Sequence, residues 1–173
     1  MTEPPSFQLA AATPADVPQI LHFIRELADY ERLAHEVTAT APLLHAALFG
    51  PERVAFAVMA KAGDEPAGYA LYFFSFSTFL GKAGVYLEDL YVTPQWRGRG
   101  LGRLLMAYVA RVAVDRGCGR MEWSVLDWNE LALKTYRAIG ATPLDGWTMQ
   151  RLTGMSLQAL AAAWPAAPPP SGR

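Results

Sequence analysis

The feature that most constrains the fold is a glycine-rich segment, Arg97-Gly98-Arg99-Gly100-Leu101-Gly102, between a predicted strand and a predicted helix. Alternate glycines let backbone N–H groups approach a ligand without an intervening Cβ, and the positive end of the following helix favours an anion. An ordinary strand-to-helix turn with solvated arginines would have the same glycine content. The spacing lacks the Gly-x-Gly-x-x-Gly of the dinucleotide fold and the Gly-Lys-Ser/Thr of a P-loop. The segment therefore predicts a turn that binds a different pyrophosphate ligand.

Hydrophobic patterns on both sides of this turn predict a mixed α/β domain. Helices are expected over residues 13–33, 40–48, 100–116, 129–139 and 155–164, and strands over 53–61, 67–76, 85–92, 120–126 and 147–152. Thr13 is expected to cap the first helix by accepting from its N–H groups. The turn Gly63-Asp64 implies an antiparallel hairpin, whereas alternating strands and helices after residue 85 imply a parallel pair. The sheet should therefore be mixed.

Composition limits the number of domains and the kinds of partner that we expect. A chain of 173 residues fits one domain, placed at residues 1–164, with a proline-rich flexible tail at 165–173. Its 15 basic and 16 acidic residues give a charge of -1, which argues against nucleic acid as a partner. The single cysteine, Cys118, allows no internal disulfide or cysteine-based zinc site, and no metal is expected. The N-terminus has no basic region followed by an apolar run, so we expect a cytoplasmic protein with no membrane partner.

Three stretches in order resemble a known superfamily. Leu87-Glu88-Asp89-Leu90-Tyr91-Val92, followed by Arg97-x-x-Gly100-x-Gly102, is similar to the acetyl-CoA motif of the GNAT superfamily of N-acetyltransferases. Together with Val125–Glu130 and Tyr136–Ala141, it resembles the diamine acetyltransferases, the spermidine/spermine and thialysine enzymes. The likeness runs from about Phe7 to Leu160. It implies an α/β fold with a mostly antiparallel central sheet, a splayed parallel pair and helices on both faces. It also implies a homodimer that uses acetyl-CoA as acetyl donor.

The resemblance assigns residues to the donor. In such enzymes a splayed strand pairs with the pantetheine arm, the glycine turn holds the diphosphate, and the next helix lines the far side. The matching positions are Leu90, Tyr91 and Val92 for the arm, Arg97, Gly98, Arg99, Gly100, Leu101, Gly102 and Arg103 for the diphosphate, and Asn129, Glu130, Leu131 and Ala132 for the far side. Asn129 fits a helix N-cap equally well, and the two roles are compatible.

Acetyl transfer needs a neutral amine, whereas a lysine-like ammonium has a pKa of about 10.4, so its deprotonation at pH 7 costs about 4.6 kcal/mol. Glu88 is the candidate base, acting directly or through water. Strand alternation should send Asp89 to the opposite face, which makes it a weaker candidate for substrate contact. Tyr136 matches the family's general acid for the departing thiolate, although an isolated tyrosine on an amphipathic helix more often packs in a core. Cys118 offers no case for an acyl-cysteine intermediate, so direct transfer is expected.

The resemblance also places residues around a small cationic amine. These are Tyr30, Glu31, Glu122, Trp123, Ser124 and Asp145, together with Glu88 and Asp89. Carboxylates at Glu31, Glu88 and Asp145 suit a diamine or polyamine through charge pairing, although each alone fits a solvated surface acid. The loop Phe76-Ser77-Thr78-Phe79 lacks the acid of spermidine/spermine enzymes, so thialysine or another lysine analogue is at least as plausible.

Two alternatives stay open. The acceptor could be a protein or peptide amine, or the chain could be a catalytically silent acyl-CoA-binding module, since fold does not fix function. The presence of both Glu88 and Tyr136 disfavours the silent module.

Overall fold

The computed structural model describes residues 6–164, which form two compact units divided between Trp128 and Asn129. The first unit contains the strands β1 (Phe7–Ala11), β2 (Phe56–Ala62), β3 (Glu65–Ser77), β4 (Lys82–Val92) and β5 (Met121–Trp123), the helices α1 (Val17–Tyr30), α2 (Ala41–Phe49) and α3 (Leu101–Asp115), and the 3₁₀ turns η1 (Pro14–Asp16), η2 (Ala34–Glu36) and η3 (Pro94–Trp96). The second unit contains α4 (Glu130–Ala138) and α5 (Gly154–Ala162).

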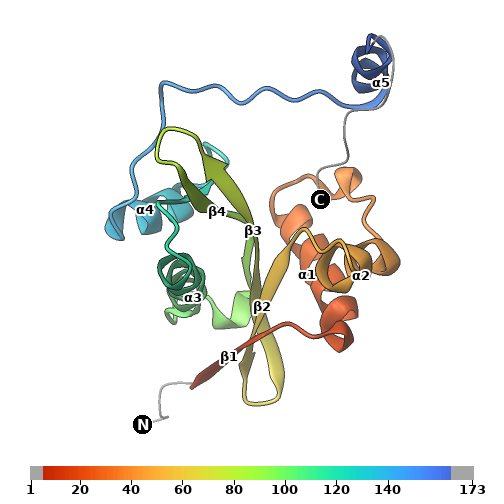
Figure 1. Ribbon diagram of the computed structural model, residues 1–173. Coiled ribbons are helices and arrows are strands. Elements are labelled where there is room, and N and C mark those ends of the chain that lie inside the picture. Colours follow the sequence, from red (N-terminus) through yellow and green to blue (C-terminus); the bar gives the residue numbers. More distant parts are fainter. Residues whose placement is uncertain (1–5, 165–173) are drawn as a thin grey trace. The chain divides into compact units, whose positions relative to one another are not determined.

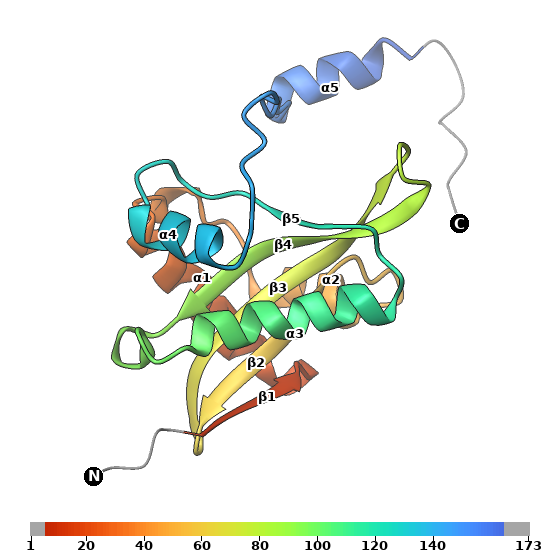
Figure 2. The same cartoon turned by 90° about the vertical axis from the view of Figure 1, so that its left-hand side faces the viewer.

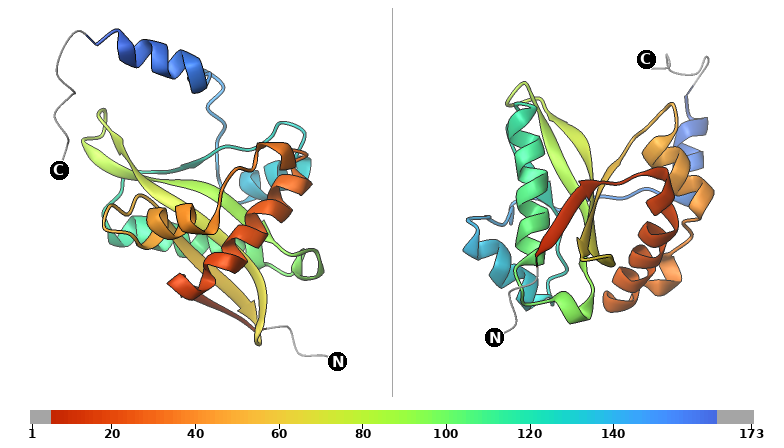
Figure 3. Two further views of the ribbon diagram at one scale, coloured as in Figure 1. Left: turned by 90° about the vertical axis from the view of Figure 1, so that its right-hand side faces the viewer. Right: turned by 90° about the horizontal axis from the view of Figure 1, so that it is seen from below.

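The first unit is built on a mixed sheet. Its five described strands lie in the order β1-β2-β3-β4-β5. The first four are antiparallel to their neighbours, and β4 and β5 are parallel. Helices α1 and α2 cover one face of this sheet and α3 covers the other (Figures 1 and 3). The predicted fold class is therefore confirmed.

The parallel pair is short and then separates. β5 pairs with β4 only from Val85↔Met121 to Leu87↔Trp123, and the rest of β4 continues along β3 as far as Gly68↔Val92. The long β3–β4 ribbon, with α3 running along it, is visible in Figure 2. The β5-facing edge of residues 88–92 is consequently outside this short ladder, as the resemblance implied.

A β-bulge lies in β4 where the parallel pairing stops. Leu71 pairs with Asp89 while the next residue of β3, Tyr72, pairs with Leu87, so Glu88 is an extra residue in the ladder. A bulge bends its strand and re-aims side chains, and such irregularities are common beside active sites. Regular alternation along β4 is therefore broken at the predicted base.

The core beneath α1 is aromatic. Phe23 stacks on Tyr69 with ring centroids 5.7 Å apart and lies 5.5 Å from the Tyr91 ring. The buried members of this core are Ile20, Phe23, Leu48, Ala57, Met59, Tyr69, Leu71 and Tyr91. On the opposite face α3 buries the stripe Leu101, Leu105, Met106, Val109 and Ala113, at the helical spacing that its sequence predicts. Both faces of the sheet are thereby covered.

Two details differ from the sequence predictions. β1 was not predicted; it pairs with β2 along Phe7↔Ala62 to Ala11↔Val58. The predicted strand 147–152 is wrong: the segment has no strand structure, and the described part of the second unit holds no strand with which it could pair. Thr13 is the N-cap of η1 and forms a capping box with Asp16, as predicted. The Asp16 carboxylate also accepts from the Thr13 N–H (2.7 Å) and hydroxyl (2.8 Å).

The remaining helices begin and end within a few residues of their predicted bounds. The predicted tail, 165–173, lies outside the described residues. Within residues 6–164, no helix combines the length and apolar character needed to cross a lipid bilayer.

Candidate functional site

The glycine-rich turn connects η3 to α3 and has the backbone of an anion cradle. Gly98 (φ 71°) and Gly100 (φ 85°) both adopt the left-handed region, which a side chain would strain. A Cβ built at either position would meet nothing within 4 Å, so the space in front of the turn is open. Gly100 is the N-cap of α3 and has no side chain to accept from the helix's first N–H groups. These N–H groups and the helix dipole fit a phosphate ligand.

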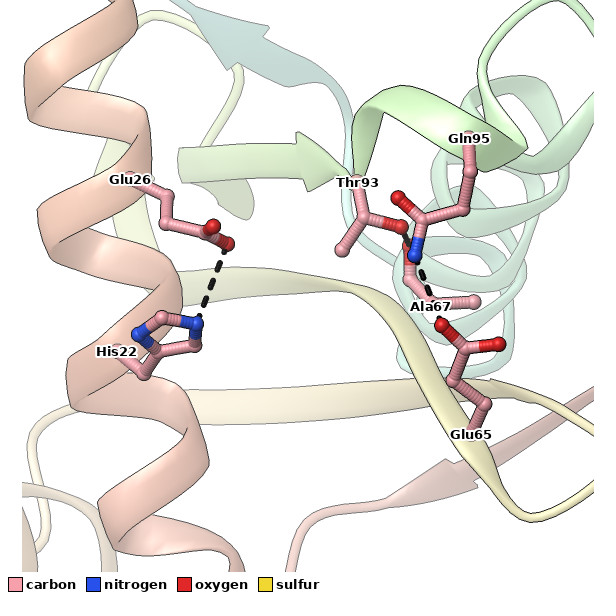
Figure 4. Close-up of polar contacts among 6 residues, drawn as sticks. All are labelled: His22, Glu26, Glu65, Ala67, Thr93 and Gln95. Carbon is pink, nitrogen blue, oxygen red and sulfur yellow. Dashed lines mark hydrogen bonds and ion pairs between the residues drawn. The ribbon is translucent and has the colours of Figure 1, made fainter.

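Side-chain contacts fix the segment leading into this turn to the start of β3. The Thr93 hydroxyl donates to the Ala67 carbonyl (3.2 Å), and the Gln95 amide donates to the Glu65 carboxylate (2.8 Å), as Figure 4 shows. The Thr93 N–H donates to the same Ala67 carbonyl at 3.0 Å. The turn therefore starts from a backbone position set by the sheet.

The contacts of the arginines in the turn could not be predicted from the sequence. Arg97 Nε donates to the Val92 carbonyl at 2.9 Å, and its guanidinium lies 4.9 Å from the centre of the Tyr30 ring and 5.6 Å from that of Tyr91. Arg99 lies 5.1 Å from the Trp96 ring. The planar Arg97 side chain thus packs against the end of α1, and its role toward a diphosphate stays a prediction, as does that of exposed Arg103.

Tyr91 joins the same contacts from beneath α1. Burial raises the pKa of its phenol, and the charge of Glu26 and a hydrogen bond to it raise that pKa further, while Arg97 acts in the opposite direction. Glu26 Oε2 also lies 3.6 Å from His22 Nε2 (Figure 4). The side chain of Tyr91 therefore lies on the α1 face of the sheet. Its backbone is the part that could pair with the pantetheine arm, as predicted for residues 90–92.

Three carboxylates, Glu31, Glu88 and Asp89, act electrostatically on Tyr69, and we call them the acidic cluster. The Tyr69 hydroxyl donates to Asp89 Oδ2 at 2.6 Å. Burial raises the pKa of Asp89, and the hydrogen bond from Tyr69 lowers it. Burial, followed by the charge of Asp89, raises the pKa of Glu31. Burial raises the pKa of Tyr69 well above its usual value, and all three carboxylates add to that effect.

The bulge bears on one sequence inference. Simple alternation predicted that Glu88 and Asp89 would lie on opposite faces and act separately. The bulge at Glu88 interrupts that alternation. Asp89 is bonded to Tyr69 and Glu88 is exposed, so separate roles for the two acids stay a prediction. Their proposed contacts with a substrate stay predictions.

Other predicted substrate residues lie around the end of α1 and along β5. The Tyr30 ring lies 5.8 Å from the ring of Trp128, and the guanidinium of Arg32 lies 5.4 Å from that indole. Ser124 Oγ is 2.6 Å from the Tyr86 hydroxyl. Glu122 forms an ion pair with Arg120 at 2.8 Å, and Trp123 ends β5 opposite Leu87. Glu122 and Ser124 are therefore already engaged by neighbouring side chains.

The second unit contains the remaining candidates. The Asn129 side chain accepts from the Ala132 N–H at 3.2 Å, which confirms the N-cap interpretation. Glu130, Leu131 and Ala132 form the first turn of α4. Tyr136 lies one turn beyond Ala132 on the same helix face, because residues four apart are neighbours on a helix. Asp145 lies in a turn closed by the Trp147 N–H and the Leu144 carbonyl (3.0 Å).

Sequence reasoning missed Tyr69 and Trp128 as members of this region. A tyrosine in a buried strand needs a partner for its hydroxyl, which is a usable signal. Finding Asp89 as that partner requires the register of β3 and β4, including the bulge. Within residues 6–164, no group of three or more His, Cys, Asp or Glu side chains could hold a metal ion.

Comparison with known proteins relates this geometry to chemistry. Residues 19–141 match the model of the acetyltransferase (GNAT) family. The chain is 40% identical over 161 residues to a thialysine N-epsilon-acetyltransferase from Bos taurus, covering 87% of this chain and 94% of that protein. It is 32% identical to an L-ornithine N5-acetyltransferase from Arabidopsis thaliana, covering 88% and 87% of the two chains. A solved integron cassette protein from V. cholerae superposes with a TM-score of 0.76 at 25% identity, covering 91% of this chain and 99% of the other.

Proposed function

Since this chain belongs to the GNAT family of acetyltransferases, we propose that its acceptor is the side-chain amine of a small amino acid of the lysine-analogue class. The chain is an N-acetyltransferase. The relatives are named for thialysine and L-ornithine, and both compounds are amino acids that carry a terminal primary amine. The observation that carries the proposal is the acidic cluster of Glu31, Glu88 and Asp89, whose charge suits an ammonium group.

The family's donor is acetyl-CoA, which supplies an activated acetyl group. The residues present fit its diphosphate: the open, uncapped N-terminus of α3 and the left-handed Gly98 and Gly100 leave N–H groups accessible. Leu101, Gly102 and Arg103 begin α3 and would complete the cradle. The β5-facing backbone of Leu90 to Val92, beyond the short parallel ladder, would pair with the pantetheine arm.

On the acceptor side, Glu88 takes a proton from the ammonium, directly or through one water, so that the nitrogen can attack the acetyl carbonyl. The exposed position of Glu88 on the bulge supports this role, because a base must reach a ligand that enters from solvent. Asp89 is partly buried and hydrogen-bonded to Tyr69, which suits an electrostatic role better than proton transfer. Tyr30 and Glu31, at the end of α1, would contact the distal part of the amine.

On the leaving-group side, the Tyr136 hydroxyl donates a proton to the departing sulfur. A phenol with a pKa near 10 can donate to a thiolate whose conjugate acid has a pKa of about 8.5 when the two are held together. The N–C bond forms as the C–S bond breaks. The first ammonium proton passes to Glu88 before the attack, and the phenol proton goes to sulfur. The second proton that the nitrogen loses as it becomes an amide restores the Tyr136 phenol. Asn129 to Ala132, which start the same helix, would line the far side of the donor.

We further propose that both units belong to one acetyltransferase domain spanning residues 1–164. The family match supports this, because it runs from residue 19 to residue 141 and so crosses the boundary after Trp128. A homodimer in the cytoplasm, with no metal requirement, completes the proposal. Light scattering coupled to gel filtration tests the dimer, and a monomer at micromolar concentration would reject it.

The acceptor class is tested by a panel of amines with the full chain and acetyl-CoA, with CoA release as the readout. We expect thialysine and ornithine to have kcat/KM values at least tenfold above those of spermidine and lysine-bearing peptides. A preference for the peptides would favour an acetyltransferase for protein amines. Tight binding of acetyl-CoA with no turnover on any amine would identify a silent acyl-CoA-binding module.

A further inference from the structure

We propose that Tyr69 is a positioning residue for amine recognition, whose hydroxyl holds the Asp89 carboxylate ionised within the acidic cluster. Asp89 then adds negative charge to the ammonium site from a position fixed by the core. The identity of the cation as an amine substrate rests on the function proposed above. The hydrogen bond itself does not depend on that function.

The ring of Tyr69 and its hydroxyl make different contacts. The residue is fully buried in β3, and its ring stacks on Phe23 with an interplanar angle of 20°. A phenylalanine would make the same stack. The hydroxyl adds a polar atom to the core, and it meets Asp89 Oδ2 at 2.6 Å across the β3–β4 ladder. This length is typical of an O–H donor on an ionised carboxylate, which is stronger than a neutral hydrogen bond.

Asp89 needs such a donor because its surroundings oppose ionisation. Burial favours the protonated form and raises the pKa of Asp89, whereas the Tyr69 hydrogen bond lowers it. Glu31 at the end of α1 and Glu88 on the β4 bulge are the other acids that act on this tyrosine. Tyr91, whose ring also contacts Phe23, interacts with Glu26 and Arg97. Arg97 in turn donates to the Val92 carbonyl.

Charge repulsion in the acidic cluster links the Tyr69–Asp89 hydrogen bond to binding of the amine. The charge of Asp89 raises the pKa of Glu31, so an ionised Asp89 opposes the ionisation of Glu31. An ammonium ion bound beside them would relieve this repulsion and be stabilised by both charges. Removing the Tyr69 hydroxyl would let Asp89 take a proton at a higher pH, and the site would lose attraction for the amine.

The test compares Tyr69→Phe with Tyr72→Phe. Tyr72 lies on the same strand, is also buried, and stacks on Phe56 with centroids 5.6 Å apart, so it controls for loss of a buried phenol. We expect Tyr69→Phe to raise KM for the amine about tenfold, or about 1.4 kcal/mol, with kcat and KM for acetyl-CoA within twofold of wild type. The rise should be larger at pH 6 than at pH 8, because Asp89 is protonated more at the lower pH. Tyr72→Phe should leave all of these unchanged.

A second measurement, the titration of individual carboxyl groups, does not depend on turnover. In ¹³C-carboxyl NMR titrations of the full chain, Tyr69→Phe should raise the apparent pKa of Asp89 and lower that of Glu31, with no change in Tyr72→Phe. The double variant Tyr69→Phe/Asp89→Asn should weaken amine binding no more than Asp89→Asn alone, since the hydroxyl acts through that carboxylate.

The outcomes separate this inference from the proposed function. If wild type acetylates no amine while Tyr69→Phe still shifts the Asp89 titration, the proposed function fails and the Tyr69–Asp89 relation stands. If wild type acetylates an amine and Tyr69→Phe has an unchanged KM at both pH values, the inference is overturned. An unchanged Asp89 titration overturns it in either case.

Discussion

The guanidinium of Arg97 lies 4.9 Å from the centre of the Tyr30 ring, so the first residue of the glycine-rich turn packs on the last residue of α1. Arg97 also donates to the carbonyl of Val92, the last residue of β4. The segment proposed to hold the donor and the helix end proposed to contact the acceptor are therefore joined by one side chain. A change at Arg97 should affect both substrates.

Arg97→Lys tests that connection. Lysine keeps the charge but loses the planar stack on Tyr30 and the fixed Nε–H donor, so we expect the free energy of unfolding to fall by about 1 to 2 kcal/mol. KM should rise for both acetyl-CoA and the amine. Arg111→Lys, on an exposed i,i+4 pair with Asp115, is the control and should leave both KM values unchanged. A change in KM for only one substrate would show that Arg97 does not join the two sides.

Gly100→Ala tests the anion cradle, with Gly117→Ala as a matched control. Both glycines have positive φ, 85° and 66°, and a Cβ at either would meet nothing within 4 Å. Each substitution should therefore cost about 1 to 2 kcal/mol of stability from left-handed backbone alone. Only the Cβ at residue 100 would stand where the diphosphate is proposed to bind. We expect calorimetric Kd for CoA to rise at least tenfold in Gly100→Ala and to stay unchanged in Gly117→Ala; equal effects would place the diphosphate elsewhere.

The sequence predicts the layers of the fold because they depend on local patterns. The helix α3 and the hairpin at Gly63-Asp64 both lie in the structure where the periodicity and turn chemistry predict them. β1 was missed because Phe7–Ala11 is a strand only by pairing with β2, which is a long-range contact. The prediction for the alternating segment 147–152 was wrong for the converse reason, since the described residues of its unit, 129–164, contain no strand with which it could pair.

The sequence supplies candidate residues for the site but not their geometry. Glu88 and Asp89 are candidates by residue type, whereas the bulge at Glu88 appears only when β3 and β4 are paired. Arg97 was predicted beside a phosphate from its place in the turn. Its contacts with Val92 and Tyr30 depend on how α1 crosses the sheet, and no local pattern encodes that crossing.

The raised pKa values of Glu31 and Asp89 predict a specific pH dependence of stability. A carboxyl whose folded-state pKa exceeds its unfolded value of about 4 stabilises the fold below pH 4, and this contribution is lost as pH rises through the raised pKa. Asp89→Asn removes the Asp89 contribution. Relative to wild type, the variant should therefore gain stability progressively as urea unfolding is repeated from pH 4 to pH 7. Asp64→Asn, in the exposed β2–β3 turn, is the control. A pH-independent difference between Asp89→Asn and wild type would contradict the assignment.

Tyr136→Phe tests the proposed acid on α4. Without the phenolic proton the departing sulfur lacks its donor, so kcat should fall by about 100-fold or more. The Kd for acetyl-CoA should stay within twofold, because the helix and its Asn129 cap are unchanged. Tyr108→Phe, on α3, controls for loss of a phenol. An unchanged kcat would remove Tyr136 from the chemistry.

The most direct test of the whole account is the rate of CoA release when the purified full chain meets acetyl-CoA and thialysine, with the acetylated nitrogen identified by NMR. We predict turnover that places the acetyl group on the side-chain nitrogen, and a kcat that falls by about 100-fold in Glu88→Gln. No CoA release above spontaneous hydrolysis with thialysine, ornithine or spermidine would contradict the account.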